Sequence, residues 1–121
     1  MYAFYRRSPA QLFNSEGILV GEGYSGHDEG KNNPSLENVH NVGPIPRGRY
    51  DIGEPFNSPE HGPLAMPLTP QPGTDTFGRS GFLMHGDSIE HPGEASLGCI
   101  IMPHDVRELV ANGADKELQV V

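Results

Sequence analysis

The chain has 121 residues, a formal net charge of −8, a hydrophobic content of 35% and a charged content of 20%. This length suits one domain, over residues 1–121, with one hydrophobic core. Nucleic acids and anionic membrane surfaces are bound through many cations, and only eight Lys and Arg residues are present. The composition therefore argues against both kinds of partner.

Glycine and proline punctuate the chain, with 16 and 12 residues. Such a load favours short strands and shaped loops over a helical bundle, so we expect a mainly β fold. The N-terminal third predicts strands at 2–6 and 10–13, the second of which opens a hairpin over 10–24. Further strands are expected at 45–53, 81–86, 99–102 and 117–121.

Two long segments lack strand periodicity. Residues 25–46 form a polar loop that is either functional or a solvated excursion. Pro55 to Pro72 is interpreted as a second, proline-punctuated loop.

One helix is predicted, from Pro103 to Asn112. Val106, Leu109 and Val110 fall on one face of it, and Gly113 is a natural residue to end it.

The N-terminal residues lack the apolar segment of a signal peptide, and no run of eighteen apolar residues exists. We therefore expect a chain that is made in the cytoplasm without a signal peptide and does not insert into a membrane.

Cys99 is the single cysteine, so an internal disulfide is impossible, and by default such a residue is a small buried hydrophobe. His85 precedes it by fourteen positions, and both residues lie at apolar runs beside a glycine. A free thiol has a pKa near ~8.5, and an imidazole within reach can hold its proton, giving a thiolate–imidazolium pair. The layout favours a cysteine nucleophile with His85 as its base, although a chain with six histidines contains several such pairs.

The residues before the thiol fit this chemistry. Gly98 permits backbone conformations that a Cβ forbids, and adjacent N–H groups there could bind a developing oxyanion. Ser96 could brace the turn, donate to the same site, or be an ordinary loop serine.

Phe82-Leu83-Met84-His85-Gly86 followed by Ser96-Leu97-Gly98-Cys99-Ile100 resembles L,D-transpeptidase (YkuD-like) catalytic domains, in which His-Gly precedes Ser-His-Gly-Cys. Gly43 to Tyr50 resembles the Thr-Pro-x-Gly-x-Phe/Tyr strand of that family. The small L,D-transpeptidase-related antibacterial toxins of type VI secretion are more similar still. That likeness extends from about Gly17 to Val121 and is carried by residues 23–26, 41–46 and 78–82.

The resemblance implies a β-sandwich with one short C-terminal helix, long loops and no cofactor. It makes Cys99 the nucleophile and His85 the general base and acid, with the Gly86 carbonyl orienting the imidazole. The implied substrate is the peptidoglycan stem tetrapeptide, attacked at the carbonyl of its third residue. The thioester is then resolved by water (trimming), by a D-amino acid (exchange) or by a second stem (cross-linking).

Leu97 stands where the wider family has histidine, which makes cross-linking less expected than trimming or exchange. The toxin resemblance also implies secretion into the periplasm of a target bacterium. A cognate immunity protein and a component of the secretion apparatus are the partners that follow from it.

Other residues near the motif are candidates for substrate binding. Arg79 could clamp a substrate carboxylate or form a structural salt bridge, and a straight strand would place it about 20 Å from His85. Asp87 and Ser88 lie beside the base and could brace it. The resemblance alone places Tyr24 in the cleft.

Two other functions remain open. A zinc peptidase could draw ligands from the six histidines, but none forms a His-Glu-x-x-His helix or another compact spacing. These histidines are His27, His40, His61, His85, His91 and His104. A non-catalytic module that binds wall fragments or a protein would leave Cys99 merely buried.

Overall fold

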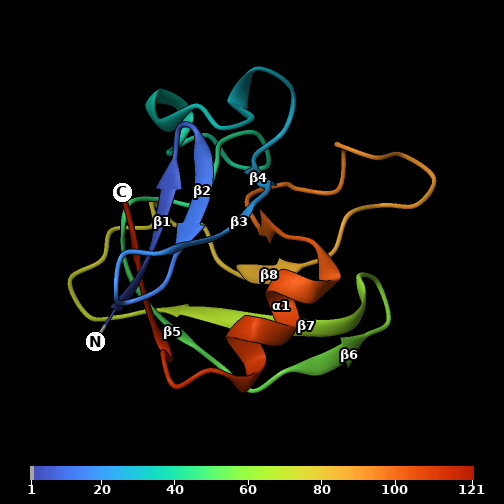
Figure 1. Cartoon of the computed structure of the whole chain (residues 1–121). Helices are drawn as coiled ribbons and strands as arrows, with labels where there is room; N and C mark the ends of the chain where they lie inside the picture. Colours follow the sequence, from blue (N-terminus) through green and yellow to red (C-terminus); the bar gives the residue numbers. More distant parts are fainter. Residues whose placement is uncertain (1) are drawn as a thin grey trace.

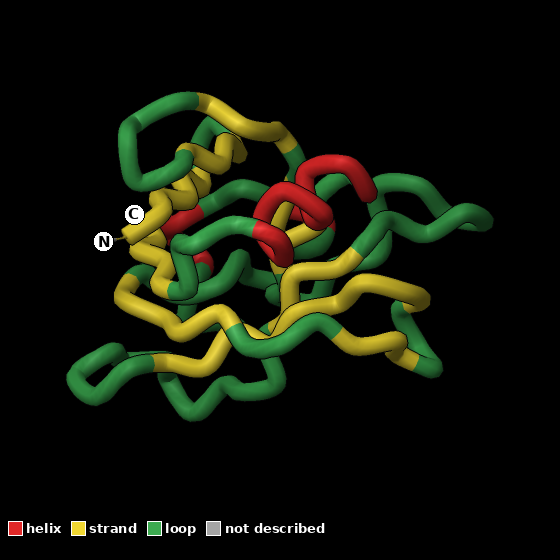
Figure 2. The backbone as a smooth tube through the Cα atoms, turned by 60° about the horizontal axis from the view of Figure 1, so that its bottom comes forward, coloured by secondary structure: helices red, strands yellow, loops and turns green. Residues whose placement is uncertain are grey.

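A computed structural model describes residues 2–121 and shows short strands around one core, with a single α-helix (Figures 1 and 2). The prediction of a mainly β fold with one short helix near the C-terminus is confirmed. The strands are β1 (Tyr2–Arg7), β2 (Ala10–Phe13), β3 (Leu19–Glu22), β4 (Tyr24–Ser25), β5 (Gly48–Ile52), β6 (Phe56–Ser58), β7 (Gly62–Pro70), β8 (Leu83–His85), β9 (Ile100–Ile101) and β10 (Glu117–Val120). The helices are α1 (His104–Asn112) and the 3-10 turns η1 (Asp28–Gly30) and η2 (Pro34–Leu36).

The strands form one mixed sheet that curls back on itself. Its order is β3-β2-β1-β10-β5-β7-β8-β9-β4, with β6 paired to β7. The two ends of this order, β3 and β4, are separated in the chain by Gly23 alone, so the sheet must wrap around to bring them together. A Cβ at Gly23 would collide with the carbonyl oxygen of Ile101, so glycine is required where the wrap closes.

The core fills the inside of this curl. Its members that are 0% exposed include Tyr5, Tyr50, Met66, Met84 and Leu118, which come from five different strands. Met84 of β8 pairs with Ile100 of the parallel β9, and both side chains are fully buried. Because successive strand residues face opposite sides, the neighbours of this pair face away from the core.

Within residues 2–121, no helix is long and apolar enough to cross a membrane. Helix α1 packs against β7. Val106 is buried as predicted, but Leu109 is 60% exposed, so the predicted apolar face is wrong at that position. Arg107 is buried instead, because its guanidinium donates hydrogen bonds to the carbonyls of Met102, Pro63 and Leu64. Gly113 ends the helix in an extended conformation, with its N–H donating to the Val110 carbonyl.

The prediction of a loop from Pro55 to Pro72 is wrong, because this segment holds β6 and the nine-residue β7. A proline has no backbone N–H to donate, yet β7 keeps its hydrogen bonds to neighbouring strands through its carbonyl groups and its remaining N–H groups. The Pro67 carbonyl accepts from Gly53 N–H, and Leu68 N–H donates to the Phe82 carbonyl. The strand therefore tolerates its prolines.

Candidate active site

His85 and Cys99 lie at the neighbouring parallel strands β8 and β9. His85 is the last residue of β8, and Cys99 immediately precedes β9. Since Met84 and Ile100 are paired and face the core, His85 and Cys99 share the opposite side of the sheet. Both line a cavity of about 450 Å³. The structure thus brings the predicted nucleophile and base together at one cavity.

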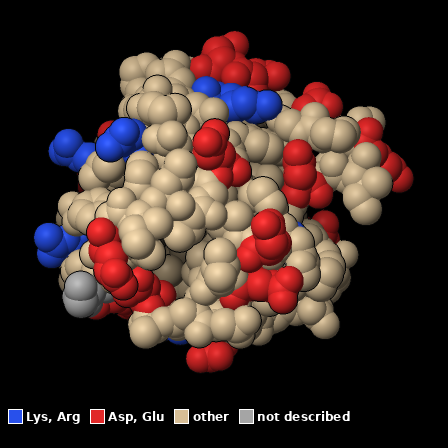
Figure 3. All heavy atoms as spheres, in the orientation of Figure 1, with Lys and Arg blue, Asp and Glu red and all other residues tan. Residues whose placement is uncertain are grey.

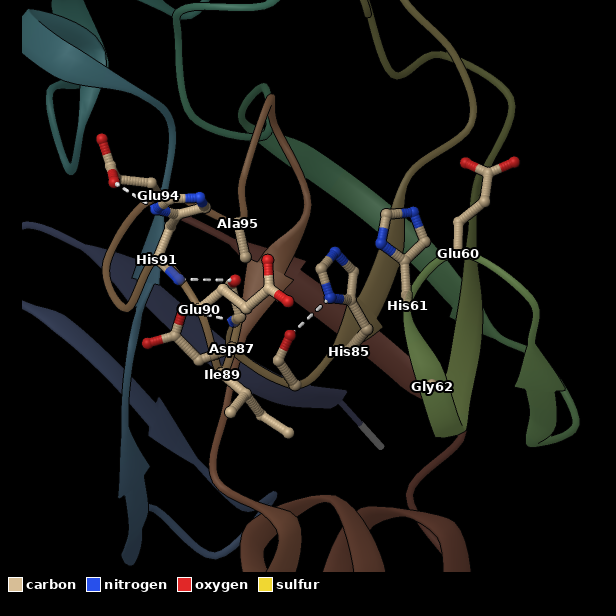
Figure 4. A pocket seen from close by; sticks show the side chains of 12 residues that line it. Glu60, His61, Gly62, His85, Asp87, Ile89, Glu90, His91, Glu94 and Ala95 are labelled. Carbon is tan, nitrogen blue, oxygen red and sulfur yellow. Dashed lines mark hydrogen bonds and ion pairs between the residues drawn. The ribbon is translucent and has the colours of Figure 1, made fainter.

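The imidazole of His85 is held in one tautomer. Its Nδ1 lies 2.8 Å from the carbonyl oxygen of Gly86, in line with the role that the resemblance implies for this residue (dashed in Figure 4). A carbonyl only accepts, so Nδ1 carries the proton and Nε2 carries the lone pair. His85 is 1% exposed, and its Nε2 has no hydrogen-bond partner within residues 2–121. Buried polar atoms are nearly always paired, so this lone pair is available for proton transfer.

The environment keeps both groups neutral. Burial lowers the pKa of His85 to about 4, the Gly86 contact opposes this, and positive charge on His61 and Arg107 lowers it further. Burial also raises the pKa of the Cys99 thiol, against the opposing effects of the Leu83 N–H, which donates to Sγ at 3.4 Å, and of the Arg79 charge. Both pKa shifts favour the neutral thiol and imidazole over the thiolate–imidazolium pair that we expected from the sequence.

The lowered pKa of His85 predicts a pH-dependent stability. Between pH 6.5, where an ordinary histidine titrates, and about 4, the unfolded chain binds a proton that the folded chain does not. The free energy of unfolding should therefore fall as the pH drops through this window and should be insensitive to His85 above it. The effect amounts to a few kcal/mol at most, at about 1.4 kcal/mol per pKa unit.

Urea unfolding of wild type and His85→Gln at pH 7.5, 6, 5 and 4 measures this contribution. The difference between the two proteins should change with pH in that window, because other titrating groups are common to both. Parallel stability curves would contradict the assignment of a neutral buried His85.

Ser96 braces the turn that precedes the thiol. Its side chain is 0% exposed, and its Oγ donates to the Cys99 carbonyl at 2.6 Å. The same oxygen accepts from the N–H groups of Gly26 at 2.9 Å and Gly98 at 3.1 Å. Of the roles considered for Ser96, the structure shows the bracing one. The Gly98 N–H is thus engaged with Ser96, and an oxyanion site at the adjacent N–H groups of this turn stays a prediction.

Gly98 shapes the turn in a different way. Its φ of +137° is a conformation that other residues rarely adopt, and a Cβ there would press on the guanidinium of Arg79. Ser25, which we missed from the sequence, holds the same turn. Its buried Oγ donates to the Gly98 carbonyl at 3.1 Å and accepts from the Ile45 N–H at 2.9 Å. Residues 23–26 were part of the resemblance, but it assigned no role to Ser25.

Arg79 ties two loops together beside the cavity. The chain folds back, so Arg79 lines the same cavity as His85 and Cys99. Its guanidinium is 6% exposed and donates to four main-chain carbonyls, those of Glu37 (2.6 Å), Pro44 (2.9 Å), Gly43 (2.9 Å) and Leu97 (3.1 Å). Both terminal nitrogens are engaged with the protein itself. This arrangement favours a structural role for Arg79 over a clamp for a substrate carboxylate. The partners of the guanidinium are main-chain carbonyls, and not the acidic side chain of the salt bridge that we considered from the sequence.

Tyr24 and Asp87 anchor the 86–95 loop, which connects β8 to the turn at Ser96 and projects from the body in Figure 1. The Tyr24 hydroxyl donates to Asp87 Oδ1 at 2.6 Å and accepts from the Ala95 N–H at 2.8 Å. Asp87 also accepts from the N–H groups of Ser88 and Gly93. Although burial raises the pKa of Asp87, these hydrogen bonds outweigh it and lower the value overall. Tyr24 is 9% exposed and is not among the described residues that line the two cavities at His85, so the structure does not place it in the cleft.

His61, at the β6–β7 turn, is a site residue that the sequence did not reveal. Its ring stacks on that of His85, with centroids 4.0 Å apart and planes 23° apart (Figure 4). Among six histidines without a common spacing, no sequence signal distinguishes it. His61 and His85 also line an adjoining cavity of about 660 Å³, whose wall carries Glu60, Asp87, Glu90, His91 and Glu94.

The surface is more acidic than the residue counts suggest. Arg7, Arg79 and Arg107 are buried, which leaves few basic side chains to offset the sixteen acids (Figure 3).

Within residues 2–121, no three His, Cys, Asp or Glu side chains are grouped so that they could hold a metal ion.

Comparison with known proteins places the chain in a family. The sequence model of the Tlde1 domain matches residues 20–121, whereas no curated protein matches the chain by sequence. The helical cell shape determining protein Pgp2 from Campylobacter jejuni has a similar fold, with a TM-score of 0.57 and 18% identity over 98% of this chain and 46% of Pgp2.

The present chain thus spans less than half of Pgp2. The catalytic domain of the E. faecium L,D-transpeptidase, solved acylated by ertapenem, aligns with a TM-score of 0.48 and 17% identity, over 99% of this chain and 95% of that domain. Since the family model covers most of the sequence, the chain belongs to the Tlde1 domain family, the L,D-transpeptidase-related effectors of type VI secretion.

Proposed function

We propose that the chain is a cysteine-dependent enzyme that modifies peptidoglycan stem tetrapeptides through a thioester intermediate. The observation that carries this proposal is the lone pair of His85 Nε2, buried and unpartnered within residues 2–121, at the cavity that Cys99 also lines. Membership of an L,D-transpeptidase-related family supports the choice of substrate.

In the first half-reaction His85 acts as the general base. Nε2 takes the proton of the Cys99 thiol as Sγ attacks the carbonyl carbon of the third stem residue. The Leu83 N–H and the Arg79 charge both stabilise the developing thiolate. The imidazolium returns its proton to the nitrogen of the departing D-alanine as the C–N bond breaks, and the tripeptide remains attached to Sγ.

In the second half-reaction the thioester is resolved. Nε2 takes a proton from water or from the amine of a D-amino acid, the new C–O or C–N bond forms, and Sγ leaves with the proton. Water gives the trimmed tripeptide, whereas a D-amino acid gives an exchanged tetrapeptide. Leu97, at the family's histidine position, is 56% exposed at the cavity and offers no imidazole, so we favour trimming and exchange over cross-linking.

The biological role that follows is an antibacterial effector, delivered by type VI secretion into the periplasm of a target bacterium. Its action would deprive the wall of cross-linkable stems. A cognate immunity protein and a component of the secretion apparatus are the protein partners of this proposal. The delivery route, the site of action and both partners are inferred from membership of the Tlde1 domain family.

A muropeptide assay tests the proposed reaction. The protein is incubated with disaccharide tetrapeptide, with or without an added D-amino acid, and products are followed by mass. We expect loss of one alanine without the additive and replacement of that alanine with it. Unchanged muropeptide masses under both conditions would refute the proposal.

The same assay separates the alternative chemistries. Iodoacetamide should abolish conversion, whereas a chelator should leave it intact. The reverse pattern would favour the zinc peptidase. A non-catalytic binding module would convert nothing, and its toxicity or binding would survive the replacement of Cys99.

A further inference from the structure

The ring stacked on His85 belongs to a residue that the proposed reaction does not yet use. His61 lies in the turn before β7, far in sequence from both motif segments. Its ring covers one face of the His85 imidazole at a centroid distance of 4.0 Å. His85 is 1% exposed, whereas His61 is half-buried, so His61 stands between the base and solvent.

This stack constrains the orientation of the base. The hydrogen bond from Nδ1 to the Gly86 carbonyl fixes one point of the ring but leaves rotation about that contact. A nearly parallel ring on one face removes this freedom, because tilting His85 would lose the contact. Together the two contacts hold Nε2 toward the cavity without any hydrogen bond of its own within residues 2–121.

The stack also couples the charges of the two histidines. His85 must become positive when it takes the Cys99 proton, and a neutral aromatic ring tolerates a cation on its face. A positively charged His61 at this distance would instead oppose that transfer, since like charges disfavour each other's ionised forms. Histidine is the side chain whose ordinary titration range spans the neutral region.

We propose that His61 is a positioning residue for His85: its neutral ring holds and covers the base, and its protonation switches the base off. The inference rests on the proposed role of His85 as the base. Several charged or titratable groups surround the two histidines, and none of them is changed in the test below. Glu60 lies next to His61 in the chain, Arg107 is on α1, and Cys99 and Arg79 line the cavity. The 86–95 loop contributes Asp87, Glu90, His91 and Glu94.

Three variants separate the two parts of this role. His61→Phe keeps an aromatic ring but removes the titrating group, His61→Ala removes both, and His61→Gln is a second neutral variant if phenylalanine perturbs folding. The readouts are the NMR titration of the His85 ring between pH 3 and 8, a range that contains its pKa of about 4, and the rate of Cys99 alkylation by iodoacetamide between pH 5.5 and 8. Neither readout requires peptidoglycan, so they remain informative even if the proposed substrate is wrong.

We expect His61→Phe to raise the titration midpoint of His85 by about one pH unit, because a neighbouring positive charge is lost. The ratio of its alkylation rate at pH 6 to that at pH 8 should exceed the wild-type ratio at least about threefold. At pH 8, His61→Ala should react about tenfold more slowly than wild type, and His61→Phe should restore most of that loss.

An unchanged His85 titration in both neutral variants would overturn the switch. Equal alkylation rates for wild type and His61→Ala at pH 8 would overturn the positioning role. A His61→Phe protein as slow as His61→Ala would show that the ring's nitrogens, and not its stacking, are what matter, and would also contradict the proposal.

Discussion

Replacing Cys99 with alanine is expected to reduce conversion of the tetrapeptide by at least about 10⁴-fold, because removing a covalent nucleophile leaves only binding and electrostatic contributions. The fold should survive this change. Cys99 Sγ makes two long contacts, with the Leu83 N–H at 3.4 Å and the Gly81 carbonyl at 3.9 Å, and the side chain is half-buried at a cavity. The loss of unfolding free energy should therefore stay within about 1 kcal/mol.

Cys99→Ser provides the matched control. It keeps the size and the hydrogen-bonding capacity of the side chain but replaces a nucleophilic sulfur with a hydroxyl that is far harder to ionise. We expect it to be almost as inactive as Cys99→Ala, with wild-type thermal unfolding. Conversion by either variant within tenfold of wild type would remove Cys99 from the reaction.

Replacing Arg79 with methionine is expected to lower the free energy of unfolding by about 3–5 kcal/mol, since it leaves four carbonyls without their donor. Methionine fills a similar volume, so the loss reports the hydrogen bonds more than a cavity. The carbonyl of Leu97 lies beside Gly98, so the turn before Cys99 should loosen and activity should fall together with stability. Urea denaturation and the muropeptide assay on the same preparation measure both.

Arg79→Lys separates this role from substrate binding. Lysine keeps the charge but cannot reach four carbonyls with a fixed planar fork. A structural Arg79 predicts that lysine restores little of the stability. A rise in KM with unchanged stability, in either variant, would show instead that Arg79 is a clamp for a substrate carboxylate.

The regular elements were predictable where local signals were strong. Ala10 to Phe13 is a strand as its pattern predicts, and the helix begins one residue after Pro103 and ends at Asn112. β7 was missed because proline was weighed as a strand breaker, whereas the strand is held by the Pro67 carbonyl as an acceptor and the Leu68 N–H as a donor. Leu109 was misplaced because helical periodicity cannot show that a buried arginine occupies the helix–sheet contact.

The proposed nucleophile and base could be chosen from the sequence because the family resemblance singles out Cys99 and His85, whereas a thiol and an imidazole alone are a weak signal in a chain with six histidines. Their supporting residues were harder to predict. Ser25, Arg79 and His61 act through contacts with residues distant in sequence, and each is an ordinary residue type in its own segment. The neutral state of the pair also depends on burial, which follows from the closed sheet and not from the motif.

Intact-mass spectrometry of the acyl-enzyme tests the central claim most directly. The protein is mixed with disaccharide tetrapeptide, quenched in acid at short times and digested to locate any adduct. The account predicts an added mass equal to the substrate less one alanine, on the peptide that contains Cys99, released by hydroxylamine as a thioester should be. An acyl group on another residue, or continued conversion by protein whose Cys99 is fully alkylated, would contradict it.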